Sequence, residues 1–347
     1  MSKKVQLNEN ELEGKLFMRG NVLMSKMSIF LIIIIIITGC TADKEVNYKD
    51  GNTVSIAEQY GLAYAPLQIM KAKKLMEKNM PGIKVEWKQL GNTAAIREAM
   101  LAEDVDVGFM AIPPFLIGWD NGMKWKIASG LSISPVALVT YKDHIKSIKD
   151  FTMEDRIALP QPGSIQHILL SMACEKEFGD AGKLDDVLVT LAHPDGMNAL
   201  LAKKEITAHF TAPPYLFKEL EQKGMHQILD GNDVIGNKFT FIVGVATGKF
   251  HDEKTDTYKA FVKSLHEAII FMRQHPEEAS KMLAEIYQIP EDELFTYLTW
   301  KDTEYNSTVY GIHPFAEFMK KHGYISKLPE ELDEILWEDV SYEHEDI

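Results

Sequence analysis

The sequence predicts an α/β fold of two doubly wound lobes that are built alike and joined by two crossovers. Residues 199–216 repeat the plan of residues 99–116 at an offset of one hundred positions. In each copy an amphipathic helix precedes a short apolar strand, and a Pro-Pro pair then begins the next helix, where the missing proline N–H costs nothing. The matching residues are Ala99 with Ala199, Leu101 with Leu201, Ala102 with Ala202, Pro113 and Pro114 with Pro213 and Pro214, and Leu116 with Leu216. Because ligands of such folds bind at the carboxyl ends of the strands, we expect the ligand site between the two Pro-Pro loops.

Length and composition allow two sizeable hydrophobic cores and argue against some partners. The 347 residues are 46% hydrophobic and 25% charged, as in ordinary globular proteins. The formal net charge of -14 at pH 7 argues against nucleic acid or an anionic membrane surface as the main partner, because both require a basic face. The cysteines are Cys40 and Cys174. We interpret Cys174, which lies within a predicted helix, as a small buried hydrophobic residue.

The amino-terminal part is predicted to contain a leader and export signal (residues 1–39) and a tether (residues 40–52). Residues 29–37 form an unbroken apolar run, which is too short for a membrane span of about 20 residues but typical of the core of an export signal. The run ends in Thr38-Gly39-Cys40, which resembles the lipobox of bacterial lipoproteins. That resemblance implies a lipid on Cys40 that holds the protein at the extracytoplasmic face of the cell membrane. A short anchor and an ordinary cleaved signal are the alternatives.

The first lobe is predicted to comprise residues 53–141 and 239–347. Strands and helices alternate there as in a doubly wound sheet. The expected strands are 54–60, 85–90, 125–132, 136–141 and 239–245, and the expected helices are 66–80, one after the Gly91-Asn92-Thr93 turn, one begun by Pro113, and several beyond Thr255. Pro66 and Pro113 are placed where a helix begins, and Pro81-Gly82 where one ends.

The second lobe is predicted to comprise residues 142–238, inserted into the first. The chain would therefore cross between the lobes near Tyr141 and again near Lys238. The expected elements are strands at 156–160, 187–192 and 208–212, a helix from Ser164 through Glu177, and a helix that ends at Lys203-Lys204.

Helix starts in both lobes supply the first candidate ligand-binding residues. Gly163 and Ser164 begin a helix of the second lobe, and Asn92 and Thr93 begin one of the first. Backbone N–H groups at a helix N-terminus favour anions or polar oxygens, and glycine allows the backbone to approach a ligand closely. Ala111, just before the first Pro-Pro helix, is expected at the same edge. An ordinary turn with an N-cap is the alternative for both pairs.

Further candidates lie near these loops. The aromatic ones are Tyr60, Tyr64, Trp119 and Tyr215. Each either forms a wall against a flat or apolar ligand or belongs to the core. His167, one turn inside the helix that follows Ser164, either donates to a ligand or faces solvent, and Ser134 lies between two predicted strands.

The strand before the second Pro-Pro pair and the scarcity of arginine bear on the ligand. His209 and Thr211 share one face of that strand by alternation, and this face is either core or cleft mouth. Beyond the leader, arginine occurs only as Arg97, Arg156 and Arg273. None falls at a predicted strand-to-helix loop, which argues against a doubly charged anion that calls for a bidentate guanidinium.

Taken in order along the chain, several short motifs resemble those of solute-binding proteins of ABC importers. They are the lipobox at Cys40, the helix start at 91–93, Val105-Asp106-Val107-Gly108, Leu159-Pro160, Gly163-Ser164 and the two Pro-Pro loops. The pattern is most similar to the group of nitrate-, sulfonate-, taurine- and thiamine-precursor-pyrimidine-binding proteins, over residues 51–320. The resemblance implies a type II periplasmic-binding-protein fold that traps a small solute between its lobes and delivers it to permease and ATPase subunits.

These observations predict a binding protein rather than an enzyme. The sequence has no HExxH, GxSxG, P-loop or GxGxxG motif, and its histidines lack metal-ligand spacing. Cys174 alone cannot form the cysteine-rich motif of the fungal pyrimidine synthases, which share this fold. We expect a monomer without cofactor, metal or nucleic acid, whose ligand is a small polar or singly anionic solute of the sulfonate, nitrate or taurine kind. A thiamine-precursor pyrimidine and a lipid-anchored sensor without transport are the alternatives.

Overall fold

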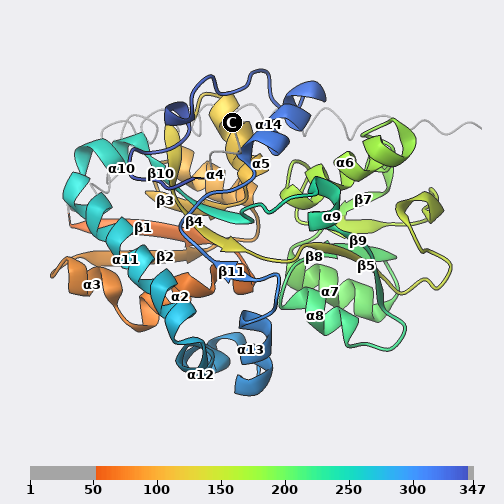
Figure 1. Cartoon of the computed structure of the whole chain (residues 1–347), viewed down its shortest axis with the longest axis horizontal. Coiled ribbons are helices and arrows are strands. Elements are labelled where there is room, and N and C mark those ends of the chain that lie inside the picture. The colour runs from red at the N-terminus through yellow and green to blue at the C-terminus, as the bar shows by residue number, and fades with distance from the viewer. Residues whose placement is uncertain (1–51, 343–347) are drawn as a thin grey trace, which may run out of the picture. The chain divides into compact units, whose positions relative to one another are not determined.

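Two β-sheets with helices packed on their faces make up the described part of the chain, residues 52–342, in a computed structural model (Figure 1). The leader and signal segment predicted from the sequence, with Cys40, lie outside the described residues. We call each sheet with its helices a lobe. The α/β class predicted from the sequence is confirmed.

The first sheet has the strand order β11-β4-β10-β3-β1-β2. Its strands are β1 (Thr53–Glu58), β2 (Lys84–Gln89), β3 (Val107–Met110), β4 (Trp125–Ile133), β10 (Ile242–Thr247) and β11 (Glu304–Tyr305). β1 lies parallel to β2 and β3, with Ile56 opposite both Trp87 and Val107. β10 lies antiparallel to β3 and β4. The central strands β1 and β3 are buried along their whole length, as expected for strands that helices cover on both faces of a sheet.

The second sheet has the strand order β7-β6-β8-β5-β9. Its strands are β5 (Ala137–Thr140), β6 (Ile157–Leu159), β7 (Leu188–Thr190), β8 (Ala208–Thr211) and β9 (His226–Asp230). β6 is parallel to β7 and β8, and β5 is antiparallel to β8 and β9. The series β7-β6-β8-β5-β9 therefore repeats β2-β1-β3-β10-β4 strand for strand. The shared plan that the sequence repeat predicts is confirmed.

The points where the chain crosses between the lobes follow from which sheet each strand joins. The first predicted lobe boundary, after residue 141, lies one strand too late. The sequence assigns the strand at 136–141 to the first lobe, whereas β5 pairs with β8 and β9 of the second sheet. The chain therefore leaves the first sheet between Ile133 and Ala137, and it returns between Asp230 and Ile242. A short, fully buried apolar strand such as β5 carries no pattern that reveals which sheet it joins.

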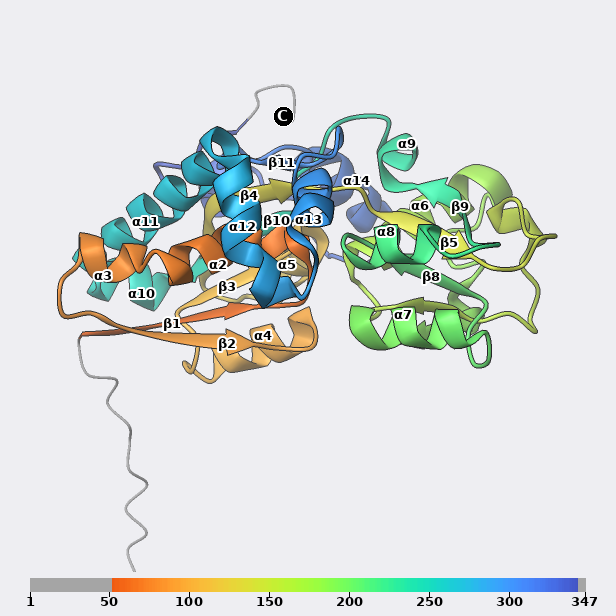
Figure 2. The same cartoon turned by 90° about the horizontal axis from the view of Figure 1, so that it is seen from below.

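Helices cover both faces of each sheet. In the first lobe they are α2 (Ala65–Ala72), α3 (Leu75–Asn79), α4 (Thr93–Leu101), α5 (Ile112–Asp120), α10 (Gly248–Glu253), α11 (Thr255–Gln274), α12 (Pro276–Tyr287), α13 (Glu291–Leu298) and α14 (Ile312–Lys321). In the second they are α6 (Ile165–Phe178), α7 (His193–Ala202), α8 (Tyr215–Leu220) and α9 (Gly231–Ile235). Figure 2 shows α11 alongside α2 and α3, and in Figure 1 α6 and α9 lie on the opposite face of the second sheet from α7 and α8. Short 3-10 helices are η1 (Leu62–Tyr64), η2 (Ile148–Asp150), η3 (Asp185–Val187) and η4 (Leu332–Glu334).

The single helix that the sequence predicts at 66–80 is two helices. Lys74 adopts the left-handed conformation with φ 50° between α2 and α3. The break redirects the chain so that Leu75 and Met76 are buried, and α3 packs against α11. Apolar spacing alone did not reveal this turn, because both halves present apolar residues to the same core.

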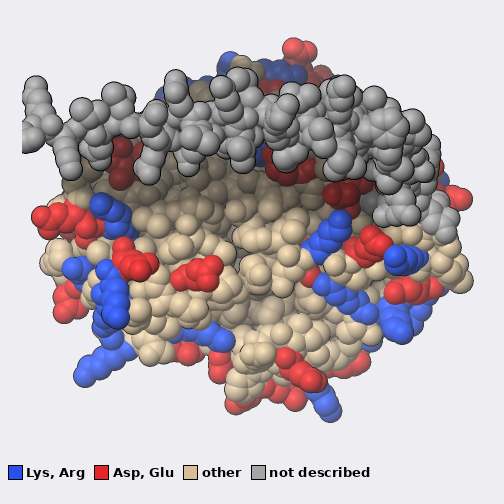
Figure 3. Space-filling view, turned by 180° about the vertical axis from the view of Figure 1, so that it is seen from behind, with Lys and Arg blue, Asp and Glu red and all other residues tan. Residues whose placement is uncertain are grey.

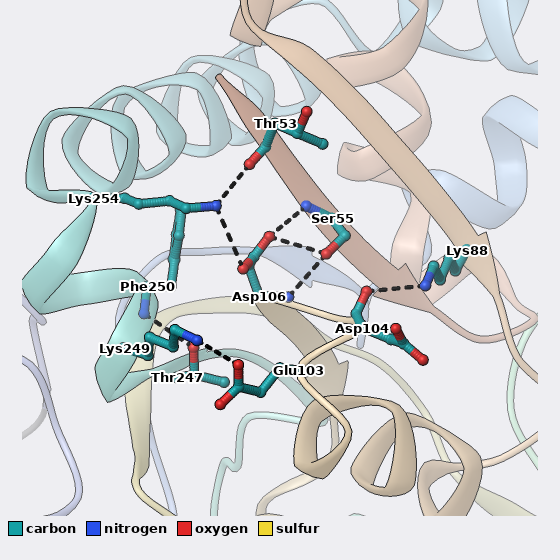
Figure 4. A network of polar contacts seen from close by, with 10 residues as sticks. All are labelled: Thr53, Ser55, Lys88, Glu103, Asp104, Asp106, Thr247, Lys249, Phe250 and Lys254. Carbon is teal, nitrogen blue, oxygen red and sulfur yellow. Dashed lines mark hydrogen bonds and ion pairs between the residues drawn. The ribbon is translucent and has the colours of Figure 1, made fainter. Parts of the chain in front are cut away.

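A polar network fixes the amino ends of the first sheet's strands (Figure 4). The Asp106 carboxylate, just before β3, accepts from Ser55 N–H at 2.8 Å and from Ser55 Oγ at 2.9 Å. Lys254 of the α10–α11 junction donates to Thr53 C=O at 2.9 Å and lies 3.9 Å from Asp106 Oδ1. The Val105-Asp106-Val107-Gly108 motif is therefore part of the scaffold, at the opposite end of the strands from the loops discussed below.

The surface carries both signs of charge. Figure 3 shows acidic and basic side chains interspersed on one face, with neither sign gathered into a single large patch.

Among residues 52–342, no helix combines the length and apolarity needed to cross a membrane. The thiol of Cys174 is buried in α6, as predicted, and burial raises its pKa to about 12.

Candidate functional site

A cavity lies where strand-to-helix junctions of both lobes meet. Its first-lobe lining is Gln59, Tyr60, Gly61, Ala63, Tyr64, Thr93, Ala111, Pro114, Phe241 and Ile242, and its second-lobe lining is Pro160, Ser164, Ile165, Gln166, His193, Ala212 and Pro213. Most of these residues follow β1, β2 or β3 in the first lobe and β6, β7 or β8 in the second. Carboxyl ends of parallel strands are where ligands of open α/β sheets bind.

Helix N-termini from both lobes face this cavity. Thr93 is the first residue of α4, Ala111 is the N-cap of α5, Ser164 is the N-cap of α6, and His193 is the first residue of α7. The aligned peptide dipoles of a helix place partial positive charge at its N-terminus. The cavity is therefore electrostatically suited to an anionic or oxygen-rich group.

Local hydrogen bonds hold the start of α4, one of the two helix starts that the sequence predicts to bind the ligand. Asn92 Oδ1 caps α4 by accepting from Ala95 N–H at 3.0 Å, and Thr93 Oγ1 accepts from Gln59 Nε2 at 3.1 Å. Both the side chain of Thr93 and that of Gln59 line the cavity. Asn92 itself does not line it, so its contribution is to orient the helix start.

The start of α6 is built around glycine. Gly163 has φ 76°, a conformation that side chains rarely adopt, and a Cβ there would lie 2.8 Å from Ile117 Cδ1 of the other lobe. Gly163 N–H donates to His167 Nδ1 at 3.0 Å, and Ser164 Oγ accepts from His167 N–H at 3.3 Å. His167 Nε2 lies 3.2 Å from Asp185 Oδ1. His167 is thus buried and supports the loop from the side away from the cavity. Neither of the two alternatives predicted from the sequence, donation to a ligand or exposure to solvent, describes this position. Ser164, by contrast, lines the cavity.

The structure brings some of the predicted site residues to the cavity and leaves others behind it. Those that line it are Tyr60, Tyr64, Thr93, Ala111 and Ser164. Those outside the lining are Asn92, Trp119, Ser134, Gly163, His167, Thr211 and Tyr215. Trp119 is buried in α5 beneath Lys327, whose Nζ lies 4.4 Å from the ring centroid. Ser134 is buried in the β4–β5 connection.

Residues that the sequence interpretation missed include Gln59, Gln166 and His193. Gln59 directly follows β1. His193 lies shortly after β7 and is the first residue of α7, just before Pro194. The rule that sites lie at the carboxyl ends of strands applies to both positions, so the signal was present for these two. Gln166, inside the first turn of α6, has no such signal.

A buried polar cluster extends from the cavity into the second lobe. His193 Nδ1 lies 3.4 Å from His209 Nε2 and 3.3 Å from Thr211 Oγ1. His209 Nδ1 lies 2.6 Å from Glu219 Oε1, and the Tyr215 ring stacks on His193 with centroids 5.8 Å apart. The face of β8 that carries His209 and Thr211 is therefore buried behind the cavity lining.

Burial dominates the titration of this cluster. It lowers the pKa of His193 to about 3 and that of His209 to about 3, and it raises the pKa of Glu219 to about 9. Removing a charge from water is costly, so the neutral form of each group is favoured. Burial also raises the pKa of the Tyr64 and Tyr215 hydroxyls.

Contacts between the lobes surround the cavity and leave it small. Leu62 N–H donates to Pro213 C=O at 3.0 Å, and Ala94 N–H donates to Gln161 Oε1 at 3.0 Å. Tyr297 of α13 donates to the Glu221 carboxylate at 2.6 Å. The cavity volume of about 30 Å³ holds about two waters. A solute with several heavy atoms does not fit between the lobes as they stand in this structure and would hold them further apart.

The lining carries little formal charge. Among the described residues that line the cavity, none is Lys, Arg, Asp or Glu. Over residues 52–342, no group of three or more His, Cys, Asp or Glu residues is arranged to hold a metal ion.

Comparison with known proteins identifies the family of this chain. The sequence pattern of the NMT1-like family matches residues 53–288. The chain belongs to the NMT1-like family. A Bacillus subtilis (strain 168) protein named for the binding of aliphatic sulfonates is 25% identical to it over 273 residues, which cover 76% of this chain and 79% of that protein. The membership that the motifs predict is thus confirmed.

Solved structures of periplasmic binding proteins share the fold of this NMT1-like chain. The alkanesulfonate-binding protein SsuA of Xanthomonas axonopodis pv. citri, solved with MOPS, has a TM-score of 0.64 at 18% identity, covering 74% of this chain and 86% of that one. The aliphatic sulphonate binding protein SsuA of Escherichia coli has a TM-score of 0.63 at 21% identity, covering 84% and 94%. The nitrate-binding protein NrtA of Synechocystis PCC 6803 has a TM-score of 0.66 at 14% identity, covering 83% and 86%. The predicted periplasmic-binding-protein fold is confirmed.

Proposed function

We propose that this chain is the solute-binding subunit of an ABC importer and captures a small, singly anionic organic solute, with a sulfonate head group favoured. The observation that carries the proposal is the convergence of junctions after β1, β2 and β3 with those after β6, β7 and β8 on one cavity. Helix N-termini from both lobes there favour negative charge. The relatives named for sulfonates and nitrate support the same class.

Individual roles follow from the chemistry of the lining. Ser164 and Thr93 offer hydroxyls at helix starts of opposite lobes, and Ala111 offers the backbone of a third. Tyr60 and Tyr64 provide apolar ring surface for the remainder of the solute. The absence of Arg and Lys from the described lining favours one negative charge over two.

The mechanism is a shift between open and closed lobes. A solute held by one lobe gains contacts from the other only when the lobes meet, so it favours the closed form by that difference in affinity. The closed form is then the one that the permease recognises. Release into the permease requires the lobes to separate again.

Calorimetric titration of the full chain in detergent tests the proposal. We expect binding of ethanesulfonate, and Ser164→Ala should weaken it about tenfold, because a hydrogen bond to a charged group is worth about 1.5–3 kcal/mol. Ser147→Ala is the matched control, since Ser147 caps η2 and does not line the cavity. Small-angle scattering of the same samples should show compaction on binding. Absence of binding by every small anion would refute the function, and equal affinity in Ser164→Ala would remove Ser164 from the site.

A further inference from the structure

The side chain of Gln161 connects the two lobes beside the cavity. Its Oε1 accepts a hydrogen bond from Ala94 N–H at 3.0 Å. Gln161 lies in the second lobe, directly after Pro160, and Ala94 lies in the first turn of α4, directly after Thr93. Both Pro160 and Thr93 line the cavity. An amide nitrogen cannot accept from a backbone N–H, so this bond fixes the orientation of the Gln161 amide.

The N–H group of Ala94 is one of those that α4 cannot satisfy by itself. The first N–H groups of a helix have no acceptor in a preceding turn. In α4 the Asn92 side chain accepts from Ala95 N–H at 3.0 Å, and Gln161 Oε1 serves Ala94 in the same way from the other lobe. Because the partial positive charge of a helix lies at these N–H groups, an anionic oxygen is a better acceptor there than the oxygen of an uncharged amide.

A second N–H group of the first lobe is occupied in the same way. Leu62 N–H, at the start of η1, donates to Pro213 C=O of the second lobe at 3.0 Å. Pro213 and Gly61, the residue before Leu62, both line the cavity. In this structure, therefore, oxygens of the second lobe satisfy two N–H groups of the first lobe at the edge of the cavity.

Two buried hydroxyl groups of the lining, by contrast, still have a proton to donate. Thr93 Oγ1 accepts from Gln59 Nε2 at 3.1 Å, and Ser164 Oγ accepts from His167 N–H at 3.3 Å. Thr93 and Ser164 are both more than nine-tenths buried, and among residues 52–342 neither hydroxyl proton has an acceptor. These unused donors beside the start of α4 indicate a place for the oxygens of a solute.

The turn that presents Ser164 also directs Gln161 at α4. Gln161 C=O accepts from Ser164 N–H at 3.1 Å, and Gly163 within the turn has φ 76°. The Gln161 side chain is itself buried. A solute that lies between Ser164 and α4 therefore moves the Gln161 amide away from Ala94.

Resting on the proposed function, we propose that Gln161 is an internal competitor of the solute. In the empty protein its amide oxygen occupies Ala94 N–H, and in the complex an oxygen of the anionic head group takes that place. The solute holds the lobes further apart than they stand here, so the two oxygens never share the N–H group. The exchange replaces an uncharged hydrogen bond with a charge-assisted one, which is about twice as strong, and an anion therefore drives it.

The competitor lowers the affinity for every anion by the same factor. A solute binds only to the fraction of molecules in which Ala94 N–H is available, so the measured Kd rises as that fraction falls. Removal of the Gln161 amide should therefore increase the affinity about fivefold, which corresponds to one uncharged hydrogen bond. A residue that contacts the solute, or one that only supports the turn, would have the opposite effect when it is removed.

Calorimetric titration of the full chain in detergent with ethanesulfonate and with nitrate tests this competition. Gln161→Ala should bind each anion that the wild type binds about fivefold more tightly. Gln161→Glu places a carboxylate, a charge-assisted acceptor, at the same N–H group, so its affinities should fall about tenfold or more. Gln222→Ala and Gln222→Glu, at an exposed glutamine of the same lobe, should bind like the wild type. Circular dichroism checks that each variant is folded.

Weaker or unchanged binding by Gln161→Ala, or a Gln161→Glu variant that binds no more weakly than the wild type, would overturn the competition and leave the proposed function intact. Failure of the wild type to bind any small anion would overturn both. If Gln161→Ala does not fold, Gln161→Asn decides. Its side chain is one methylene shorter, which draws the amide oxygen back from Ala94 N–H, so its affinity should also rise. An affinity at or below that of the wild type would overturn the competition.

Discussion

The buried Glu219 carboxyl makes a strong prediction about stability at alkaline pH. In the folded protein burial raises its pKa from 4.5 to about 9. Below pH 4.5 the folded and unfolded states both hold the proton. Between that pH and 9 only the folded state holds it, so rising pH favours the unfolded state. Above pH 9 both states are ionised and the effect is complete.

The magnitude follows from the linkage relation. Each pH unit over which one proton is bound only in the folded state changes the free energy of unfolding by about 1.4 kcal/mol. Because the Glu219 pKa of about 9 lies at the end of the interval, the wild type should lose about 2 kcal/mol between pH 7 and pH 9 from this group. Glu219→Gln cannot titrate and should not show that loss.

Urea unfolding followed by tryptophan fluorescence at pH 7, 8 and 9 measures this difference. Other groups titrate in the same range, so the comparison is between the pH slopes of wild type and Glu219→Gln rather than their absolute stabilities. Glu205→Gln, exposed in the same lobe, should keep the wild-type slope. Parallel slopes for wild type and Glu219→Gln would show that Glu219 is already ionised in the folded protein at neutral pH, and the reasoning on burial would fail.

Two further predictions concern the scaffold and the anchor. A Cβ on Gly108 would lie 2.6 Å from Ile96 Cγ2 and 2.6 Å from Met100 Sδ, so Gly108→Ala should lower the free energy of unfolding by about 1–3 kcal/mol. Gly91→Ala, where a Cβ meets nothing within 4 Å, should change it little in the same urea experiment, and equal effects would contradict this packing. Cys40→Ser should abolish lipid attachment in a bacterial host and release the protein from the membrane fraction, as measured by intact mass and detergent partitioning. A lipid that persists on the variant would refute the lipobox interpretation.

The fold was predictable from sequence to the extent that its signals were local. Each Pro-Pro pair and the apolar strand before it predict one strand-helix unit, β3 with α5 in the first lobe and β8 with α8 in the second. The strands of these units, β3 and β8, occupy matching positions in the two sheets. The partner of β5 was not predictable, because a four-residue buried strand offers no alternation and its place is decided by β8 and β9. Lys74 was missed for a similar reason, since left-handed lysine has no sequence signature of its own.

The site was predictable only in part, because helix starts are visible in sequence and side-chain orientation is not. Ser164 and Thr93 were found through their N-cap patterns, and both reach the cavity. Gly163 and His167 belong to the same loop but support it from behind. For His209, alternation left core and cleft open. The structure makes it a core residue that contacts the cavity lining through His193.

The position of the cavity between two lobes explains why its described lining has no Lys, Arg, Asp or Glu. In this structure, the N–H group of Ala94 at the start of α4 is already satisfied by Gln161 Oε1 of the other lobe. A permanently charged residue in so small a cavity would have to be desolvated each time the lobes closed without solute, at a cost of several kcal/mol. Neutral hydroxyls, helix N-termini and a neutral histidine avoid that cost. An anion held by both lobes gains contacts from each only when they meet, so closure around the anion is favoured over closure around water.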